Sequence, residues 1–193
     1  MRQILFTEQI KGADVEILIT PALFSYAKER QMVINLDEIT DVISLSEVYL
    51  KIIYCGALNA WGVRRYDKPE MGDCPYNYMD FVVWGTNNPE MLGELIGKVA
   101  NALSVEGSDQ KKKGKSEAID YGRVEQFLVG FCGKTAKEAA MTSLEEYVWL
   151  DQAYSERHAA EWERTRWLGW LVISGNPYIE GASKHKKPKD LIR

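Results

Sequence analysis

Apolar and polar residues alternate near the start of the chain and then take on a helical spacing. Ala13, Val15, Ile17 and Ile19 recur at a period of two, and Lys11-Gly12 before them suits a turn. This alternation predicts a small β-hairpin whose strands end at Thr20. A first helix follows, for which Thr20 and Pro21 supply an N-cap and a first-turn proline. Its helical spacing is marked by Leu23, Tyr26, Ala27 and Arg30.

Three further segments of the front half have helical patterns. The first begins with a capping box of Ser44 and Glu47 and ends at Gly62. Residues 76–85 predict a shorter helix, although their valines and aromatic residues also suit a strand. Asn88-Pro89-Glu90 starts the third helix, because it combines a capping side chain, a first-turn proline and a carboxylate near the positive end of the dipole. Its buried stripe is Leu92, Leu95, Ile96, Val99 and Leu103.

The back half predicts three helices, of which the last is the longest in the chain. The first carries Val124, Phe127 and Leu128 and ends near Gly133 in a left-handed C-cap. One or two turns opened by Thr135 and Glu138 come next. Thr142 and Glu145 then cap a helix from about Leu144 to Ile173, which at 1.5 Å per residue extends about 45 Å. Gly175 and Pro177 stop it.

A polar segment separates the two halves. Residues 105–117, VEGSDQKKKGKSE, contain four lysines and almost no apolar side chain. Such a composition buries too little surface to offset the entropy of ordering, so we expect a flexible linker. The predicted fold is mainly α, with a short N-terminal β-hairpin and two small helical modules, residues 1–104 and 118–193, joined by this lysine-rich linker. The second module ends in a basic tail.

Charge and composition exclude several classes of protein. Residues 1–104 carry nine Lys and Arg against 14 Asp and Glu, and the remainder carries 15 against 14. Neither half is basic enough for general binding to nucleic acid or an anionic membrane. The longest uncharged stretch near the C-terminus, residues 167–179, is shorter than the roughly 20 residues that span a bilayer, and no signal peptide is expected. We therefore expect no nucleic-acid partner and no membrane span.

The residues that could carry catalysis form no known constellation. The three cysteines, Cys55, Cys74 and Cys132, lie in no CxxC pair, which excludes a zinc site and a disulfide framework and fits a reducing cytosol. His158 lies on the apolar line of the long helix and His185 among lysines, so neither predicts a catalytic site. Residues 133–135, Gly-Lys-Thr, lack the preceding glycine and strand of a phosphate loop and predict a turn between helices. We expect no enzyme activity, cofactor or metal.

The long helix interleaves aromatic and basic residues near its end. Trp162, Trp167 and Trp170 alternate with Arg157, Arg164 and Arg166. One interpretation is a core stripe beside a solvated face of paired charges. The other is a docking surface, because Trp and Arg dominate interface hot spots and the apolar residues surround the helix after Trp167. The candidate partner-binding residues are Trp162, Arg166, Trp167 and Trp170.

These segments, taken in order, resemble a known family, the tail assembly chaperones of long-tailed bacteriophages. The front half is similar to the short-form chaperone module in its hairpin, TPALFSYAKER, EVYLKIIYCGALNAWG and YNYMDFVVWGTNNPEMLGELIGKVANAL. The back half resembles the extension of the long form in VEQFLVGFCGKTAKEAAMTSLEEYVWL, EWERTRWLGWLVI and HKKPKDLI. The similarity covers nearly the whole chain, in helical patterns without a catalytic signature.

The resemblance implies a non-enzymatic assembly factor in the host cytoplasm. The first module would coat the tape-measure protein and keep it soluble, and the extension would recruit tail-tube subunits; self-association is also possible. In many members a programmed ribosomal frameshift at A-rich codons adds the extension, and Lys111–Lys113 fall where that site would lie. The alternative is a structural tail or connector protein that stays in the virion.

Overall fold

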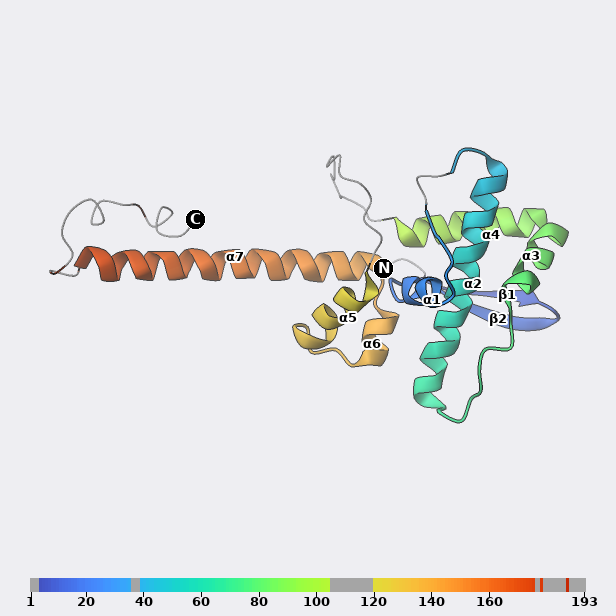
Figure 1. The fold of residues 1–193 in the computed structure, drawn as a ribbon, viewed down its shortest axis with the longest axis horizontal. Helices are drawn as coiled ribbons and strands as arrows, with labels where there is room; N and C mark the ends of the chain where they lie inside the picture. The colour runs from blue at the N-terminus through green and yellow to red at the C-terminus, as the bar shows by residue number, and fades with distance from the viewer. Residues whose placement is uncertain (1–3, 36–38, 105–119, 176–177, 179–186, 188–193) are drawn as a thin grey trace. The chain divides into compact units, whose positions relative to one another are not determined.

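The computed structural model describes residues 4–35, 39–104, 120–175, 178 and 187 (Figure 1). It confirms the mainly helical fold with an N-terminal hairpin and a long helix near the C-terminus. The elements in chain order are β1 (Leu5–Ile10), β2 (Ala13–Leu18), α1 (Leu23–Glu29), α2 (Val42–Asp67), α3 (Tyr78–Asn87), α4 (Pro89–Leu103), α5 (Tyr121–Gly130), α6 (Ala136–Met141) and α7 (Leu144–Gly175).

The described residues divide into two compact units, Met1–Val148 and Trp149–Arg193. The predicted boundary between residues 104 and 118 stays a prediction, because the expected linker, residues 105–117, lies outside the described residues. Within the first unit, however, helices from both sides of that segment are in contact: α5 packs on α1, and α6 packs on α2.

The hairpin forms where the alternation predicts it. β1 and β2 pair antiparallel, with Phe6 opposite Ile17 and Ile10 opposite Ala13. Lys11 and Gly12 connect the strands with φ values of 55° and 73°. Two consecutive residues with positive φ match the right-handed twist of the strands, so this two-residue turn sets the register. One face of the hairpin consequently delivers Phe6, Ile10, Val15 and Ile17 to the core.

Helix α2 runs through the middle of the first unit (Figure 1). It contacts β2, α1, α3, α4 and α6, and every residue from Ile52 to Ala60 is buried. An 18-residue window of α2, with a mean hydropathy of 1.2, is long and apolar enough to cross a membrane by length and composition, but 56% of it is buried inside the fold. Core helices share this composition, so the window by itself does not indicate a membrane span.

Gly62 does not end α2, contrary to the prediction. The helix continues to Asp67, and a Cβ on Gly62 would lie 2.0 Å from the Tyr26 hydroxyl oxygen. Gly56 similarly leaves room for Ile17, whose Cγ2 would be 2.8 Å from an added Cβ. Both glycines therefore serve close packing, which outweighs the roughly 1 kcal/mol that glycine costs inside a helix.

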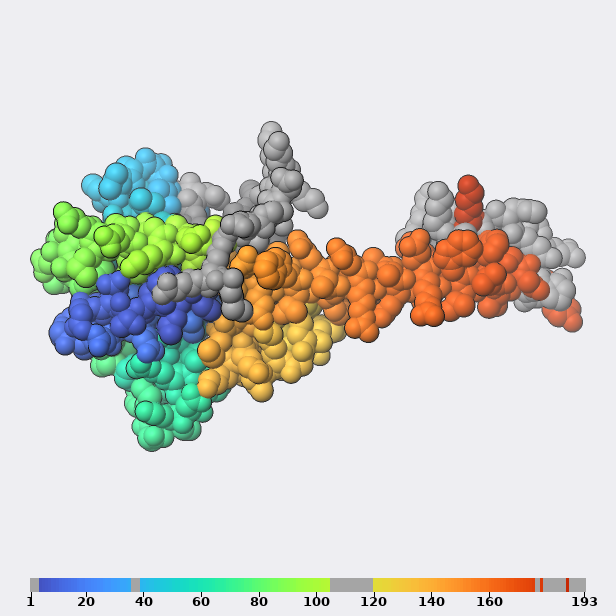
Figure 2. Space-filling model, turned by 180° about the vertical axis from the view of Figure 1, so that it is seen from behind, coloured from blue at the N-terminus to red at the C-terminus, as the bar shows by residue number. Residues whose placement is uncertain are grey.

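Helices α3 and α4 both pack against α2. Helix α3 confirms the helical alternative for residues 76–85. Asn77 and Asp80 form a reciprocal capping box at the start of α3, and Asp80 also pairs with Lys11 of the hairpin turn at 2.5 Å. Pro89 opens α4 as predicted, but the Asn88 side chain donates to the Trp84 carbonyl and does not cap it. The surfaces of the hairpin and α4 lie side by side in Figure 2. An ion pair joins them, because the Lys98 ammonium group of α4 lies 3.9 Å from the Glu8 carboxylate of β1.

Besides Asn88, three further predicted caps are wrong, because in each case the predicted residue makes a different hydrogen bond. Asp41, not Ser44, is the N-cap of α2, with Ser44 as its capping-box partner, and Glu47 instead binds Lys51 at 2.7 Å. Thr20 does not cap α1: its hydroxyl donates to the Ala140 carbonyl of α6 at 2.7 Å.

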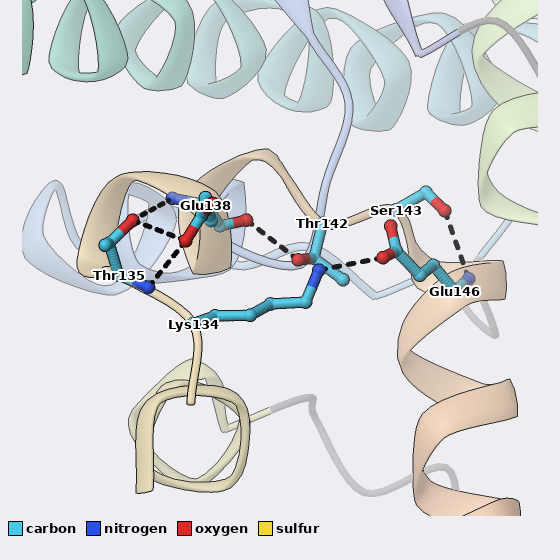
Figure 3. A network of polar contacts seen from close by, with 6 residues as sticks. All are labelled: Lys134, Thr135, Glu138, Thr142, Ser143 and Glu146. Atoms are coloured by element: carbon cyan, nitrogen blue, oxygen red, sulfur yellow. Dashed lines mark hydrogen bonds and ion pairs between the residues drawn. The ribbon is translucent and has the colours of Figure 1, made fainter. Parts of the chain in front are cut away.

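The third correction concerns the start of α7, shown in Figure 3. Thr142 donates to the Glu138 carbonyl, and the Ser143 hydroxyl accepts from the Glu146 N–H. Thr135 and Glu138 form the predicted capping box of α6, and Lys134 binds Glu146 at 2.8 Å. Gly133 takes the predicted left-handed conformation, with φ 69°. The Lys134–Glu146 ion pair thus joins the loop between α5 and α6 to the first turn of α7.

Candidate docking surfaces

Helix α7 has no buried residue, although it is 32 residues long. Its middle is charged, with Arg157 and Glu161 3.4 Å apart on successive turns. Aromatic side chains still contact one another along the helix: the rings of Tyr154 and His158 are stacked at 5.9 Å, and His158 meets Trp162 edge-on at 6.3 Å. The second unit thus presents aromatic groups on a surface that the described residues do not cover.

The structure brings some of the predicted partner-binding residues onto one face. Trp162, Arg166 and Trp170 follow one another at intervals of four and therefore share a side of α7. Trp167 lies on a different side, but its ring meets that of Trp170 edge-on at 5.6 Å. The exposed fractions of Trp162 and Trp167 are 45% and 51%, whereas Arg166 and Trp170 are half-buried. The four residues consequently form two adjoining faces.

The last turns of α7 are apolar on every side. No charged residue occurs from Trp167 to Gly175, and Leu168, Leu171 and Val172 are each more than half exposed. The Nε atom of Arg166 is shielded from solvent and makes no hydrogen bond with the described residues. An apolar surface that encircles a helix normally lies against a partner.

A groove in the first unit forms a second candidate surface, which the sequence analysis missed. It encloses about 610 Å³ between α1, the segment that follows α1 and the start of α5. Its apolar wall consists of Phe24, Met32, Val33 and Ile34, and Tyr121 lines its other side. The short apolar run directly after the predicted first helix was the available signal. The pairing of this run with the start of α5 could not be inferred, because Ile34 and Asp120 on the two sides of the groove are 86 positions apart in the chain.

Two residues of the Gly-Lys-Thr segment considered for catalysis, Lys134 and Thr135, make structural contacts. Lys134 and Thr135 bind Glu146 and Glu138, so residues 133–135 form the predicted turn between helices. All three cysteines are free, and burial raises the pKa of the Cys55 thiol to about 12. In the part of the chain that the structure describes, no three His, Cys, Asp or Glu residues group as metal ligands. His185 lies outside the described residues.

Comparison of the chain with protein-family models, with curated proteins and with solved structures finds no match.

Proposed function

We propose that this protein is a bacteriophage tail assembly chaperone that acts without enzymatic chemistry in the host cytoplasm. The proposal rests on the resemblance of its segments to that family and on one observation of the structure. That observation is the apolar end of α7, where tryptophans and exposed aliphatic side chains surround a helix with no buried residue. Such a surface supports a binding role, because Trp and Arg dominate interface hot spots.

In this proposal the two surfaces have different partners. The groove beside α1 takes an amphipathic helix of the tape-measure protein, in the helix-in-groove manner. The end of α7, with Trp162, Arg166, Trp167 and Trp170, takes a tail-tube subunit. Separate surfaces would allow one chain to hold both proteins at once.

The experiment is co-expression of the full chain with a tape-measure protein and a tail-tube protein from the genome that encodes it. We expect the Trp167→Ala/Trp170→Ala double variant to lose at least about tenfold in capture of the tube protein, as hot-spot truncation does, while the tape-measure protein stays soluble. Trp149→Ala is the matched control, because Trp149 is 58% exposed on the same helix but far from its end.

Two results would contradict this division of roles. Loss of tape-measure solubility together with tube capture would mean that Trp167 and Trp170 support the fold and are not a docking surface. Presence of the chain in purified virions would favour the alternative, a structural tail or connector protein, because a chaperone leaves the finished particle.

A further inference from the structure

A small cavity in the first unit is lined by aromatic and acidic groups. It encloses about 140 Å³ where α1, α2, α5 and α6 meet. Three tyrosines and two glutamates line it, namely Tyr26, Tyr66, Tyr121, Glu29 and Glu125, and no lysine or arginine is among its lining residues. A water molecule takes up about 30 Å³ in the liquid, so the cavity has room for a larger group.

Two of the phenols in this cavity, those of Tyr26 and Tyr121, have raised pKa values. Burial raises the pKa of Tyr121, and the charge of Glu125 and then the other two tyrosines raise it further. Burial, followed by Glu29 and Tyr66, likewise raises the pKa of Tyr26, against a smaller opposing effect of Arg65. The cavity therefore presents the neutral phenols of Tyr26 and Tyr121 beside the carboxyl groups of Glu29 and Glu125, surroundings that attract a cation and repel an anion.

The cavity and the groove beside α1 are neighbours. Ser25, Glu29 and Tyr121 line both of them. A segment that lies in the groove against Phe24 and Met32 would thus pass the carboxylate of Glu29 and the ring of Tyr121. A long basic side chain on that segment could enter the cavity while its apolar neighbours stay on the groove wall.

We propose that this cavity takes a lysine or arginine side chain of the amphipathic helix that docks in the groove, and so selects helices with a basic residue inside their apolar face. The inference rests on the proposed function for the identity of that helix. Recognition comes from Glu29 and Glu125 as ion-pair acceptors and from the tyrosine rings as cation–π partners.

The cavity can be tested without the partner. The probe is Nα-acetyl-arginine amide, added to the full chain while the NMR signals of the tyrosine rings are followed. Nα-acetyl-citrulline amide is the matched control, because it has nearly the same shape without the charge. We expect saturable shifts of the Tyr26, Tyr66 and Tyr121 rings with the arginine compound and at least about tenfold weaker binding of citrulline, as expected for loss of a charge-assisted contact.

Variants separate this cavity from general attraction to an acidic protein. Glu29→Gln/Glu125→Gln should weaken arginine binding about tenfold and keep the shape of the site. The control is Glu94→Gln, which removes an exposed carboxylate from α4 and should change nothing. Equal binding of the two compounds, or arginine binding unchanged in the double variant, would overturn the proposal.

A second measurement connects the cavity to the partner. In co-expression with the tape-measure protein, we expect the double variant to lower the soluble fraction of that protein, while Glu94→Gln does not. An unchanged soluble fraction in the double variant would show that the tape-measure helix does not use this cavity. If the wild-type chain itself leaves the tape-measure protein insoluble, the proposed function fails, and the arginine experiment still decides whether the cavity binds cations.

Discussion

Buried polar side chains make the long-range connections of the first unit. Thr20 is 1% exposed, and its hydroxyl donates to the Ala140 carbonyl while accepting from the Asn59 amide nitrogen at 2.9 Å. The same nitrogen donates to the Leu18 carbonyl at 3.1 Å. Residues far apart in the chain are thereby joined through one hydroxyl group, at the place where the hairpin leads into α1.

Thr20→Val should therefore be costly although it preserves the shape of the side chain. It leaves the buried Ala140 carbonyl without this donor and removes one acceptor of Asn59, which should lower the free energy of unfolding by about 1–3 kcal/mol. Urea denaturation measures the loss. Thr86→Val is the control: its exposed hydroxyl bonds only the preceding turn, so a change within about 0.5 kcal/mol is expected. Equal losses in the two variants would contradict the role of Thr20.

Asp80 makes the stability of the folded first unit depend on pH. The Asn77 backbone N–H, and next the Lys11 ammonium group, lower the pKa of its carboxyl group. In the unfolded chain the pKa of an aspartate carboxyl is near 3.9. Because the pKa of Asp80 is lower in the folded state, its carboxyl group stabilises the fold at pH values above about 3.9. This stabilisation is lost as the pH falls through the pKa of the folded state. Asp80→Asn should therefore lower the melting temperature at pH 7, and the difference from the wild type should shrink below about pH 4.

Melting curves of both proteins from pH 7 to pH 2 provide the measurement. The carboxyl groups of Asp41 and Glu138, whose pKa values are also lowered, are present in both proteins and cancel in the difference. A constant difference at every pH would show that the charge of Asp80 does not contribute.

At the scale of whole elements, apolar periodicity predicted both strands and most helices of the described residues, because one apolar face per element is a local property of the sequence. Helix α6 was instead predicted from its capping pair, Thr135 and Glu138, and residues 76–85 were left open between helix and strand. The ends were less predictable. Ser44 and Thr142 are residue types that often cap helices, yet Asp41 and Ser143 cap α2 and α7. The sequence offers more than one capping residue within a single turn at each of these starts, so the residue that caps could not be identified. Gly62 was predicted to end α2 because the feature that requires glycine there, the close approach of Tyr26, comes from a residue 36 positions away in the chain. The candidate residues of α7 were found from composition, whereas the groove beside α1 depends on tertiary packing.

The absence of buried residues in α7 predicts that its middle can be broken without harm to the core. Ala159→Pro removes a helical hydrogen bond and should cost that helix about 3 kcal/mol or more. We expect lower ellipticity at 222 nm but an unfolding midpoint of the core like that of the wild type. Ala57→Pro, in the buried part of α2, is the comparison and should prevent folding. A large drop of the midpoint in Ala159→Pro would mean that α7 stabilises the first unit.

At the scale of the molecule, the first unit is assembled from both sides of residues 105–119. Lys137 of α6 binds both carboxylate oxygens of Asp67 at the end of α2, at 2.5 and 2.6 Å. The Thr20 to Ala140 hydrogen bond and the packing of α5 on α1 also join elements from before and after this segment. The core thus joins elements that the composition places in separate modules.

Cutting the chain between the halves should consequently leave them associated. A protease recognition sequence in place of residues 108–114 allows cleavage of the folded protein, and we expect both fragments to co-elute in gel filtration at micromolar concentration. Thr20→Val/Lys137→Ala should reduce the co-eluting fraction. Separation of the unsubstituted fragments under native conditions would instead support two independent modules.

The uninterrupted helix of α7 has a consequence for how its sequence can change in length. Each residue advances the helix by about 1.5 Å and turns it by about 100°, so an insertion after Asp151 rotates Trp162 and Trp167 around the axis relative to Trp149. One extra residue would point the tryptophans to another side, whereas seven would restore their direction to within about 20° and displace them by about 10 Å. Length variation in this helix should therefore occur in steps of seven or eleven residues, because such steps keep the tryptophans on nearly the same side of the helix.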